Sequence, residues 1–191
     1  MDEDDVDIVR ACLAGEKERF GELVARHQAG VAGYLYRLVP NTADREDICQ
    51  DVFVKAFLNL HQFRFEARFS TWLFTIAYRR AIEVLRKRQL ATASTDDVDA
   101  ASDLDLEHDA GTTETQRIVR AQIARLSVEE QTLLALYHYQ DLGLAEISRI
   151  VDKPEGTLKS DLFRIRKKLK QGLQRQLAGQ SPESQLVRVN L

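Results

Sequence analysis

The sequence has little cysteine, proline and glycine: 2 Cys, 3 Pro and 9 Gly among 191 residues. Cys12 and Cys49 are too few for a disulfide scaffold and lack the CxxC spacing of a zinc or redox site. We therefore expect both thiols to be reduced and to lie in a core. The scarcity of glycine and proline excludes collagen-like and low-complexity chains, and the 44% of hydrophobic residues favours a helical globular protein of one large or two small domains.

Long apolar runs are also missing, so no segment can cross a bilayer. The first residues, MDEDD, are acidic where a signal peptide would be basic and then apolar, and we expect a cytoplasmic protein without direct membrane insertion. The histidines have no carboxylates or nucleophile at a meaningful spacing, and no glycine-rich phosphate loop is present. His27 lies on an apolar stripe, which favours a packed residue over a metal ligand. The sequence thus predicts no metal, no cofactor and no enzyme.

The net charge of −3 hides a clustered distribution. Acidic residues gather in residues 2–7 and 96–114, whereas basic residues gather in residues 79–88 and 159–170. One charge run is usually only a solvated face. Two basic clusters separated by acid are more typical of a chain that binds nucleic acid. The acidic stretch, residues 89–116, has few large apolar residues, so we expect a flexible linker between domains 1–88 and 117–175, followed by a tail, 176–191.

The first domain carries helical patterns. Apolar residues recur at helical spacing from Phe20 to Leu38 and predict a helix that Pro40 ends. Asn41-Thr42 can cap a second helix running to about Leu60. Val54 and Leu58 lie on the side of that helix opposite its broad apolar face, which indicates a partner-binding strip.

The segment 63–72, FRFEARFSTW, alternates aromatic residues with arginine. Aromatic faces stack on unpaired bases and arginine neutralises phosphate, so this composition suits single-stranded nucleic acid. Core packing of Phe63, Phe69 and Trp72 is the alternative, and we favour it for Trp72. Ser70 or Thr71 can cap the helix that follows, residues 72–88.

The second domain contains a helix-turn-helix pattern. A helix over residues 117–126 and a capping box at Ser127–Glu130 precede it. Residues 144–151 form the first helix, 152–154 the turn and Glu155 begins the second helix. Its core stripe is Leu158, Leu162, Ile165 and Leu169, and the opposite face carries Lys159, Ser160, Phe163, Arg164 and Lys167. This face is suited to phosphates and base edges, with Phe163 able to meet a thymine methyl group, so DNA recognition is favoured over a merely solvated face.

The runs 44–57, 63–86 and 126–169 together resemble a sigma factor of bacterial RNA polymerase, of the small extracytoplasmic-function group that retains sigma regions 2 and 4. The resemblance covers about residues 6–88 and 117–173. It implies an all-α fold of two small helical domains, region 2 and region 4. It also implies a non-enzymatic transcription initiation factor whose partners are core RNA polymerase, promoter DNA and a membrane-anchored anti-sigma factor. The anti-sigma factor would cover both domains.

The resemblance also implies three sets of site residues. The polymerase-binding set is Asp47, Gln50, Asp51, Val54 and Lys55. The set that binds the −10 element and holds its flipped bases is Arg64, Phe65, Glu66, Arg68, Ser70, Arg79, Arg80, Glu83, Arg86 and Lys87. The set that reads the −35 element is Thr157, Lys159, Ser160, Phe163, Arg164, Lys167 and Lys168. Residues around 127–139 resemble the part that docks on the polymerase flap.

The chain departs from the family pattern at three places: Arg79 replaces a usual Asn, Asp161 replaces a usual basic residue, and Val151-Asp152 replaces Leu-Gly in the turn. Asp tolerates the left-handed conformation that such a turn requires. A free-standing helix-turn-helix regulator with a helical sensor domain remains as the alternative function, and it would bind duplex DNA without polymerase. A pure interaction adaptor would bind polymerase without directing transcription.

Overall fold

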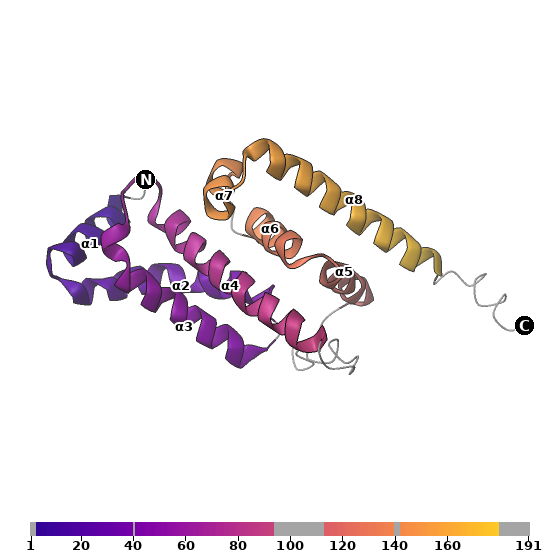
Figure 1. Cartoon of the computed structure of the whole chain (residues 1–191), viewed down its shortest axis with the longest axis horizontal. Coiled ribbons are helices and arrows are strands. Elements are labelled where there is room, and N and C mark those ends of the chain that lie inside the picture. Colours follow the sequence, from indigo (N-terminus) through magenta and orange to yellow (C-terminus); the bar gives the residue numbers. More distant parts are fainter. Residues whose placement is uncertain (1–2, 40, 94–112, 140–141, 180–191) are drawn as a thin grey trace, which may run out of the picture.

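The computed structural model describes residues 3–39, 41–93, 113–139 and 142–179, and every regular element within these ranges is a helix (Figure 1). The all-α prediction is therefore confirmed. The N-terminal half contains α1 (Glu3–Ala14), η1 (Lys17–Arg19), α2 (Phe20–Tyr36), α3 (Thr42–Leu58), η2 (Leu60–Gln62) and α4 (Phe69–Ala93). The C-terminal half contains α5 (Glu114–Ala124), α6 (Val128–Tyr139), α7 (Leu144–Val151) and α8 (Glu155–Gly179).

Helices α2, α3 and α4 form the body of the N-terminal half, with α3 packed against both of the others. The Asn41 side chain accepts a hydrogen bond of 3.0 Å from the Asp44 backbone N–H, which confirms the predicted cap of α3. The predicted capping of the next helix by Ser70 or Thr71 is wrong, because α4 begins at Phe69 and both residues lie in its first turn. Trp72 is half-buried with its ring 5.5 Å from that of Phe63, so it packs in the core as predicted.

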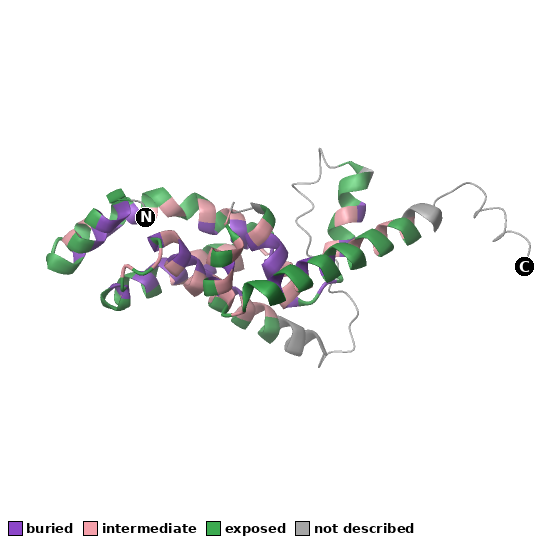
Figure 2. Cartoon of the chain, turned by 90° about the horizontal axis from the view of Figure 1, so that it is seen from above, coloured by how far each residue is buried: buried purple, intermediate pink, exposed green. Residues whose placement is uncertain are grey.

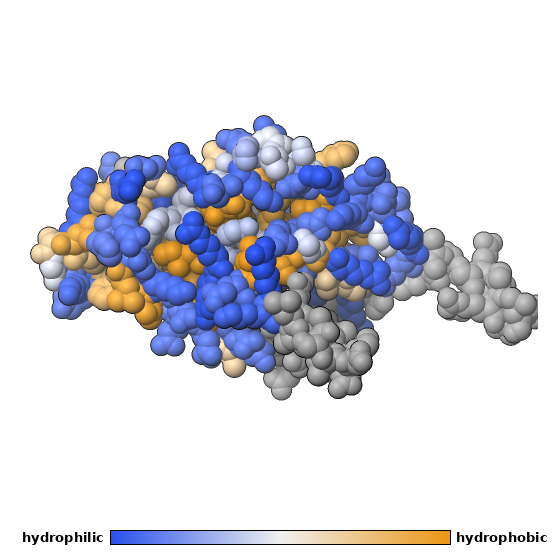
Figure 3. All heavy atoms as spheres, viewed as in Figure 1, coloured by the Kyte–Doolittle hydropathy of each residue, from blue (hydrophilic) through white to orange (hydrophobic). Residues whose placement is uncertain are grey.

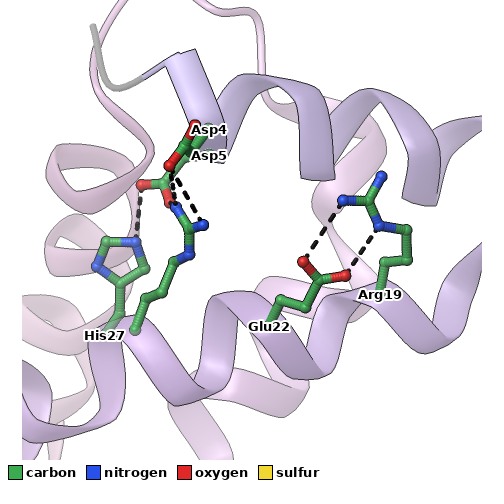
Figure 4. Close-up of polar contacts among 6 residues, drawn as sticks. Asp4, Asp5, Arg19, Glu22 and His27 are labelled. Atoms are coloured by element: carbon green, nitrogen blue, oxygen red, sulfur yellow. Dashed lines mark hydrogen bonds and ion pairs between the residues drawn. The ribbon is translucent and has the colours of Figure 1, made fainter.

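Acidic residues of the N-terminal helix α1 contact α2. The clustering of acidic residues in the sequence did not indicate this packing role. The Asp5 side chain is buried and lies 2.8 Å from His27 Nε2 and 3.5 Å from Arg26 Nη1 (Figure 4). The His27 ring in turn lies 5.4 Å from the Phe69 ring at the start of α4. A buried carboxylate needs such partners, and these contacts fix α1 on α2.

Both cysteines are free thiols. Cys12 is buried on α1 and Cys49 is half-buried on α3. Burial raises the pKa of each thiol above its ordinary value. Because only the thiolate is strongly nucleophilic, neither side chain has the character of a reactive cysteine.

The C-terminal half has the predicted helix-turn-helix. Ser127 and Glu130 form the expected capping box, with hydrogen bonds of 3.1 and 3.2 Å between side chains and backbone N–H groups. Three members of the predicted α8 core stripe, Leu158, Leu162 and Ile165, are buried, and Leu169 is partly buried. The turn after α7 is stabilised by Ser148, whose hydroxyl donates a 2.6 Å hydrogen bond to the Lys153 carbonyl.

Asp152 adopts the left-handed conformation at the C-terminus of α7, with φ 55° and ψ 49°. We expect Asp152→Gly to raise the free energy of unfolding by about 0.5 kcal/mol, because glycine meets no steric penalty at positive φ but loses more entropy on folding. Asp152→Asn should leave stability unchanged, since Asn also tolerates this conformation. Thermal and urea unfolding of the three proteins measure the difference. A glycine variant less stable than the parent would contradict this account.

The two halves pack against each other. Helix α4 contacts α6 and α7, and α2 contacts α6. The buried apolar residues of both halves belong to one continuous cluster, and Figure 2 shows buried residues on the faces where helices meet. Residues 94–112 of the predicted flexible linker lie outside the described residues, while α4 extends to Ala93 and α5 begins at Glu114.

Candidate polymerase and nucleic-acid interfaces

Helix α3 presents an apolar strip on its outer face. Val54 is 49% exposed and Leu58 is 63% exposed, as the sequence pattern predicted. Phe57 is also exposed, but its ring lies 5.1 Å from that of Phe20 and so helps to hold α3 on α2. The other residues of the expected polymerase-binding set flank the strip: Asp47, Gln50 and Lys55 are exposed and Asp51 is half-exposed.

Asp51 joins the expected polymerase-binding set to the expected −10 set. Its carboxylate lies 2.7 Å from Arg80 Nη2 on α4, and Arg80 Nη1 lies 3.0 Å from Glu83. Lys87 also lies 3.0 Å from Glu83, and hydrogen bonds from Lys87 and Arg80 hold the pKa of Glu83 below its ordinary value. Arg80 is therefore engaged inside the protein, whereas Arg79 is exposed on the same helix.

The loop before α4 contains a backbone in an unusual conformation. Phe65 has φ 58°, which is costly for a bulky aromatic residue. Its ring is held 4.8 Å from that of Phe63 and lies 5.6 Å beneath the Arg10 guanidinium of α1. Around it, Arg64, Glu66 and Arg68 are exposed and Ser70 is half-buried. The loop therefore places polar side chains around a fixed aromatic ring, an arrangement suited to holding an unstacked base.

The outer face of α8 is basic around one exposed ring. Phe163 is 68% exposed, the largest exposure among the large exposed hydrophobic residues of the described chain. The remaining members of the expected −35 set are all exposed on α8: Thr157, Lys159, Ser160, Arg164, Lys167 and Lys168. The second helix of a helix-turn-helix is suited to the major groove when it carries exposed basic residues.

Asp161 lies on the same helix and pairs with two basic residues, one on α8 and one in the turn before it. Its carboxylate pairs with Arg164 and lies 3.5 Å from Lys153. We expect Asp161→Asn to increase affinity for duplex DNA about threefold and to steepen the salt dependence by about one unit, because an anion is removed and Arg164 is released. Fluorescence anisotropy at several salt concentrations measures both effects. Glu18→Gln, an exposed acid on η1, is the control; an equal response there would show that only net charge matters.

Sequence reasoning missed the carboxylates that pair with expected DNA-binding cations. Glu129 lies 2.6 Å from Arg86, Glu130 pairs with Lys168, and Glu146 lies 3.7 Å from Arg68. The hydrogen bond from Arg86 is the main cause that lowers the pKa of Glu129. Glu130 has an evident role in the capping box and Glu129 lies in the first turn of the same helix, and no sequence signal indicates their partners Lys168 and Arg86.

A groove of about 440 Å³ lies beside α8. Its floor includes Leu133, Leu158 and Ile165, and charged residues from α6 and α8 line its rim. Figure 3 shows apolar atoms between hydrophilic ones where α6 lies between α4 and α8. An apolar floor with a charged rim is suited to an amphipathic helix of a partner.

Two other site types are not found in the described part of the chain. No group of three His, Cys, Asp or Glu residues there could hold a metal ion. No helix among the described residues is long and apolar enough to cross a membrane.

Comparison with known proteins identifies the family to which this chain belongs. Residues 23–91 match Sigma-70 region 2 and residues 116–169 match Sigma-70, region 4. The chain is 31% identical over 178 residues to the ECF RNA polymerase sigma-E factor of Haemophilus influenzae, covering 87% of this chain and 94% of that protein. It is 28% identical over 176 residues to the ECF RNA polymerase sigma factor SigW of Bacillus subtilis, covering 86% and 94%.

Two solved structures share the fold. CnrH, in complex with the cytosolic domain of CnrY, superimposes with a TM-score of 0.67 at 21% identity, covering 88% of this chain and 96% of that chain. The sigma factor RpoE of Bartonella quintana, in complex with the anti-sigma factor NepR, gives a TM-score of 0.63 at 20% identity, covering 81% and 96%. Together with the sequence matches over both halves, this shows that the chain belongs to the extracytoplasmic-function sigma factors of the sigma-70 family, with regions 2 and 4.

Proposed function

We propose that this chain binds core RNA polymerase through α3 and directs it to promoters whose −10 element is bound by region 2 and whose −35 element is bound by region 4. Region 2 comprises residues 1–88 and region 4 comprises residues 117–175, and the protein acts in the cytoplasm. The observation that carries the proposal is the exposed pair Val54 and Leu58 on α3. An exposed apolar strip set among charged residues is typical of a partner-binding surface, which favours polymerase binding over a free-standing regulator.

Recognition of the −10 element would rest on the loop at residues 64–70 and on α4. Flipping a base out of the duplex costs a few kcal/mol of stacking, which contacts in a pocket offset. Phe65 and the polar side chains of Arg64 and Glu66 are placed to hold such a base, while Arg86 and Lys87 of α4 neutralise phosphates of the adjoining duplex. Strand opening then requires binding energy alone and no covalent step.

Recognition of the −35 element would rest on α8. Lys159, Ser160, Phe163 and Arg164 face outward from the helix-turn-helix and can reach base edges, while Lys167 and Lys168 follow on the next turn and can reach phosphates. The exposed ring of Phe163 provides an apolar contact for a thymine methyl group.

An anti-sigma factor, anchored in the membrane, would hold the protein inactive by covering both regions. Two proteins of the same fold were solved in complexes, CnrH with the cytosolic domain of CnrY and RpoE with the anti-sigma factor NepR. In this chain the exposed strip on α3 offers an apolar surface to a helical partner, and the groove beside α8 offers a second concave surface with charged side chains along it. A partner lying on both would compete directly with polymerase.

The test is gel filtration of the purified chain with sigma-free bacterial core RNA polymerase, followed by transcription from a promoter library. Co-elution and promoter-dependent transcripts are expected. Binding to duplex DNA without binding to polymerase would overturn the proposal in favour of a free-standing regulator. Co-elution without promoter-dependent transcripts would identify an adaptor.

A further inference from the structure

Helix α1 contacts the loop that would bind the −10 element. The Arg10 guanidinium on α1 lies over the Phe65 ring, 5.6 Å from its centroid. The same helix contacts η2, the short helix that leads into this loop. No residue of α1 belongs to the sets that were expected to bind promoter DNA. The fold therefore brings a cation from the start of the chain to the aromatic ring at the centre of the loop.

Phe65 needs support from outside its own loop. Its φ of 58° is uncommon for an aromatic residue, so the surroundings must hold the backbone there. Phe65 is half-buried, and its ring lies 4.8 Å from the ring of the buried residue Phe63. Phe63 and Arg10 thus hold the ring together. Arg10 is the exposed partner of the two and can be replaced without opening the core.

A buried carboxylate fixes α1 itself. Asp5 Oδ2 lies 2.8 Å from His27 Nε2 on α2, and the Asp5 side chain is only 3% exposed (Figure 4). The His27 ring lies 5.4 Å from the ring of Phe69, where the loop ends and α4 begins. Apolar side chains of α1 are buried on the same helix: Val6, Ile8, Val9 and Cys12. Helix α1 is therefore anchored through Asp5 and contacts the loop through Arg10.

We propose that α1 positions the −10 loop for base capture: Arg10 fixes the Phe65 ring, and Asp5 fixes Arg10 by docking the helix on His27. Arg10 and Asp5 are positioning residues, because they act through Phe65 and do not themselves bind DNA. The inference rests on the proposed function and deepens it, since it adds two residues of α1 to the determinants of −10 binding.

A ring that is held in advance favours capture of an unstacked base. A base that leaves the duplex loses its stacking, and ordering the loop at the same moment would add to that cost. When Phe65 is already in place, a larger fraction of the molecules is competent to bind. A cation over a partly exposed aromatic ring is worth about a threefold change in that fraction.

Fluorine NMR of the free chain tests the contact without DNA or polymerase. para-Fluorophenylalanine replaces Phe65, and the variants are Arg10→Gln, which removes the cation, and Arg10→Lys, which keeps one. The control is Lys17→Gln, an equal loss of charge at an exposed position on η1. We expect the parent, Arg10→Lys and the control to share one resonance, and Arg10→Gln to move it toward the position of the unfolded chain. An unchanged resonance in Arg10→Gln would overturn the positioning of Phe65.

Base capture is measured with the chain bound to core polymerase. The DNA is a promoter recovered from the library experiment, with the fluorescent adenine analogue 2-aminopurine at successive non-template positions of the −10 element. Arg10→Gln should weaken the unstacking equilibrium about threefold, and Arg10→Lys should restore it. The slope of affinity against salt should stay unchanged. A slope lower by about one, with an unchanged fluorine resonance, would show that Arg10 binds a phosphate and would overturn the positioning role.

A double-mutant cycle tests the anchor. Asp5→Asn removes the buried charge, and Asp4→Asn, at an exposed neighbour that also pairs with Arg26, is the matched control. Asp5→Asn should weaken base capture at least about threefold, and adding Arg10→Gln should weaken it no further, because a loosened α1 no longer presents Arg10. Additive losses would overturn the link between Asp5 and Arg10. Circular dichroism verifies folding, and His27→Gln probes the same contact if Asp5→Asn does not fold.

Failure of the proposed function gives a different result. Absence of polymerase binding, or of any promoter in the library, would reject the proposed function, while the fluorine resonance of the free chain would still decide whether Arg10 holds Phe65. Promoter-dependent transcription with equal base capture in Arg10→Gln and the parent would keep the proposed function and overturn this inference.

Discussion

The double substitution Val54→Arg and Leu58→Arg is expected to abolish co-elution of the chain with core RNA polymerase. Both side chains are largely exposed on α3, so arginine can be accommodated without disturbing the core. A partner surface that covers the apolar strip must then bury two charges, and central apolar residues of interfaces commonly cost 2 kcal/mol or more when lost. We expect affinity for polymerase to fall by about 100-fold or more. Titration of labelled chain with core polymerase measures it.

Leu13→Arg is the matched control for this prediction. Leu13 is 46% exposed on α1, close to the 49% exposure of Val54, but it lies outside the strip. This variant should bind polymerase as the parent does, with unchanged helicity and melting temperature. Equal loss of binding in both variants would show that added charge, and not the α3 surface, is responsible.

Asp51 is a poorer position at which to test the polymerase surface. Its carboxylate is paired with Arg80 of α4, so a substitution there removes an internal contact as well as any external one. Substitutions at Val54 and Leu58 test the contact with polymerase without removing an internal contact, because their exposed side chains contribute little to folding.

Leu73→Ala is expected to lower the free energy of unfolding by about 2–5 kcal/mol. Leu73 is fully buried in the middle of the α2–α3–α4 body, and its truncation leaves a cavity in a core that is continuous between the two regions. For a chain of this size the melting temperature should fall by about 4–20 °C. Differential scanning calorimetry and urea unfolding give both values.

Leu58→Ala removes the same atoms from an exposed site and serves as the control. It should change stability by less than about 0.5 kcal/mol, as surface substitutions usually do. If Leu73→Ala were equally mild, Leu73 would not lie in a tightly packed core. Because the cores are continuous, we also expect the parent to unfold in one transition, and two separate transitions would show that the regions are only loosely docked.

The sequence by itself determined the main helices from Phe20 onward, whereas it did not predict α1. Asn41 before α3, the Ser127–Glu130 capping box and the apolar stripe of Leu158, Leu162 and Ile165 are local signals, because the groups involved are a few residues apart. The exposed positions of Val54, Leu58 and Phe163 follow from the same periodicity. Asp152 in the left-handed conformation was likewise predictable from its place in the turn.

Only the tertiary structure decided which charges meet. Asp5 is buried against Arg26 and His27, although the acidic N-terminus reads as a solvated segment. Glu146 accepts a hydrogen bond from the Gly143 N–H of its own helix, and it also accepts one from Thr71, which was predicted to cap α4. These partners are about 20 to 80 residues apart, and no periodicity or spacing encodes such pairs. These pairs form because the apolar faces of separate helices pack against one another. The packing brings charged residues at the edges of those faces close together.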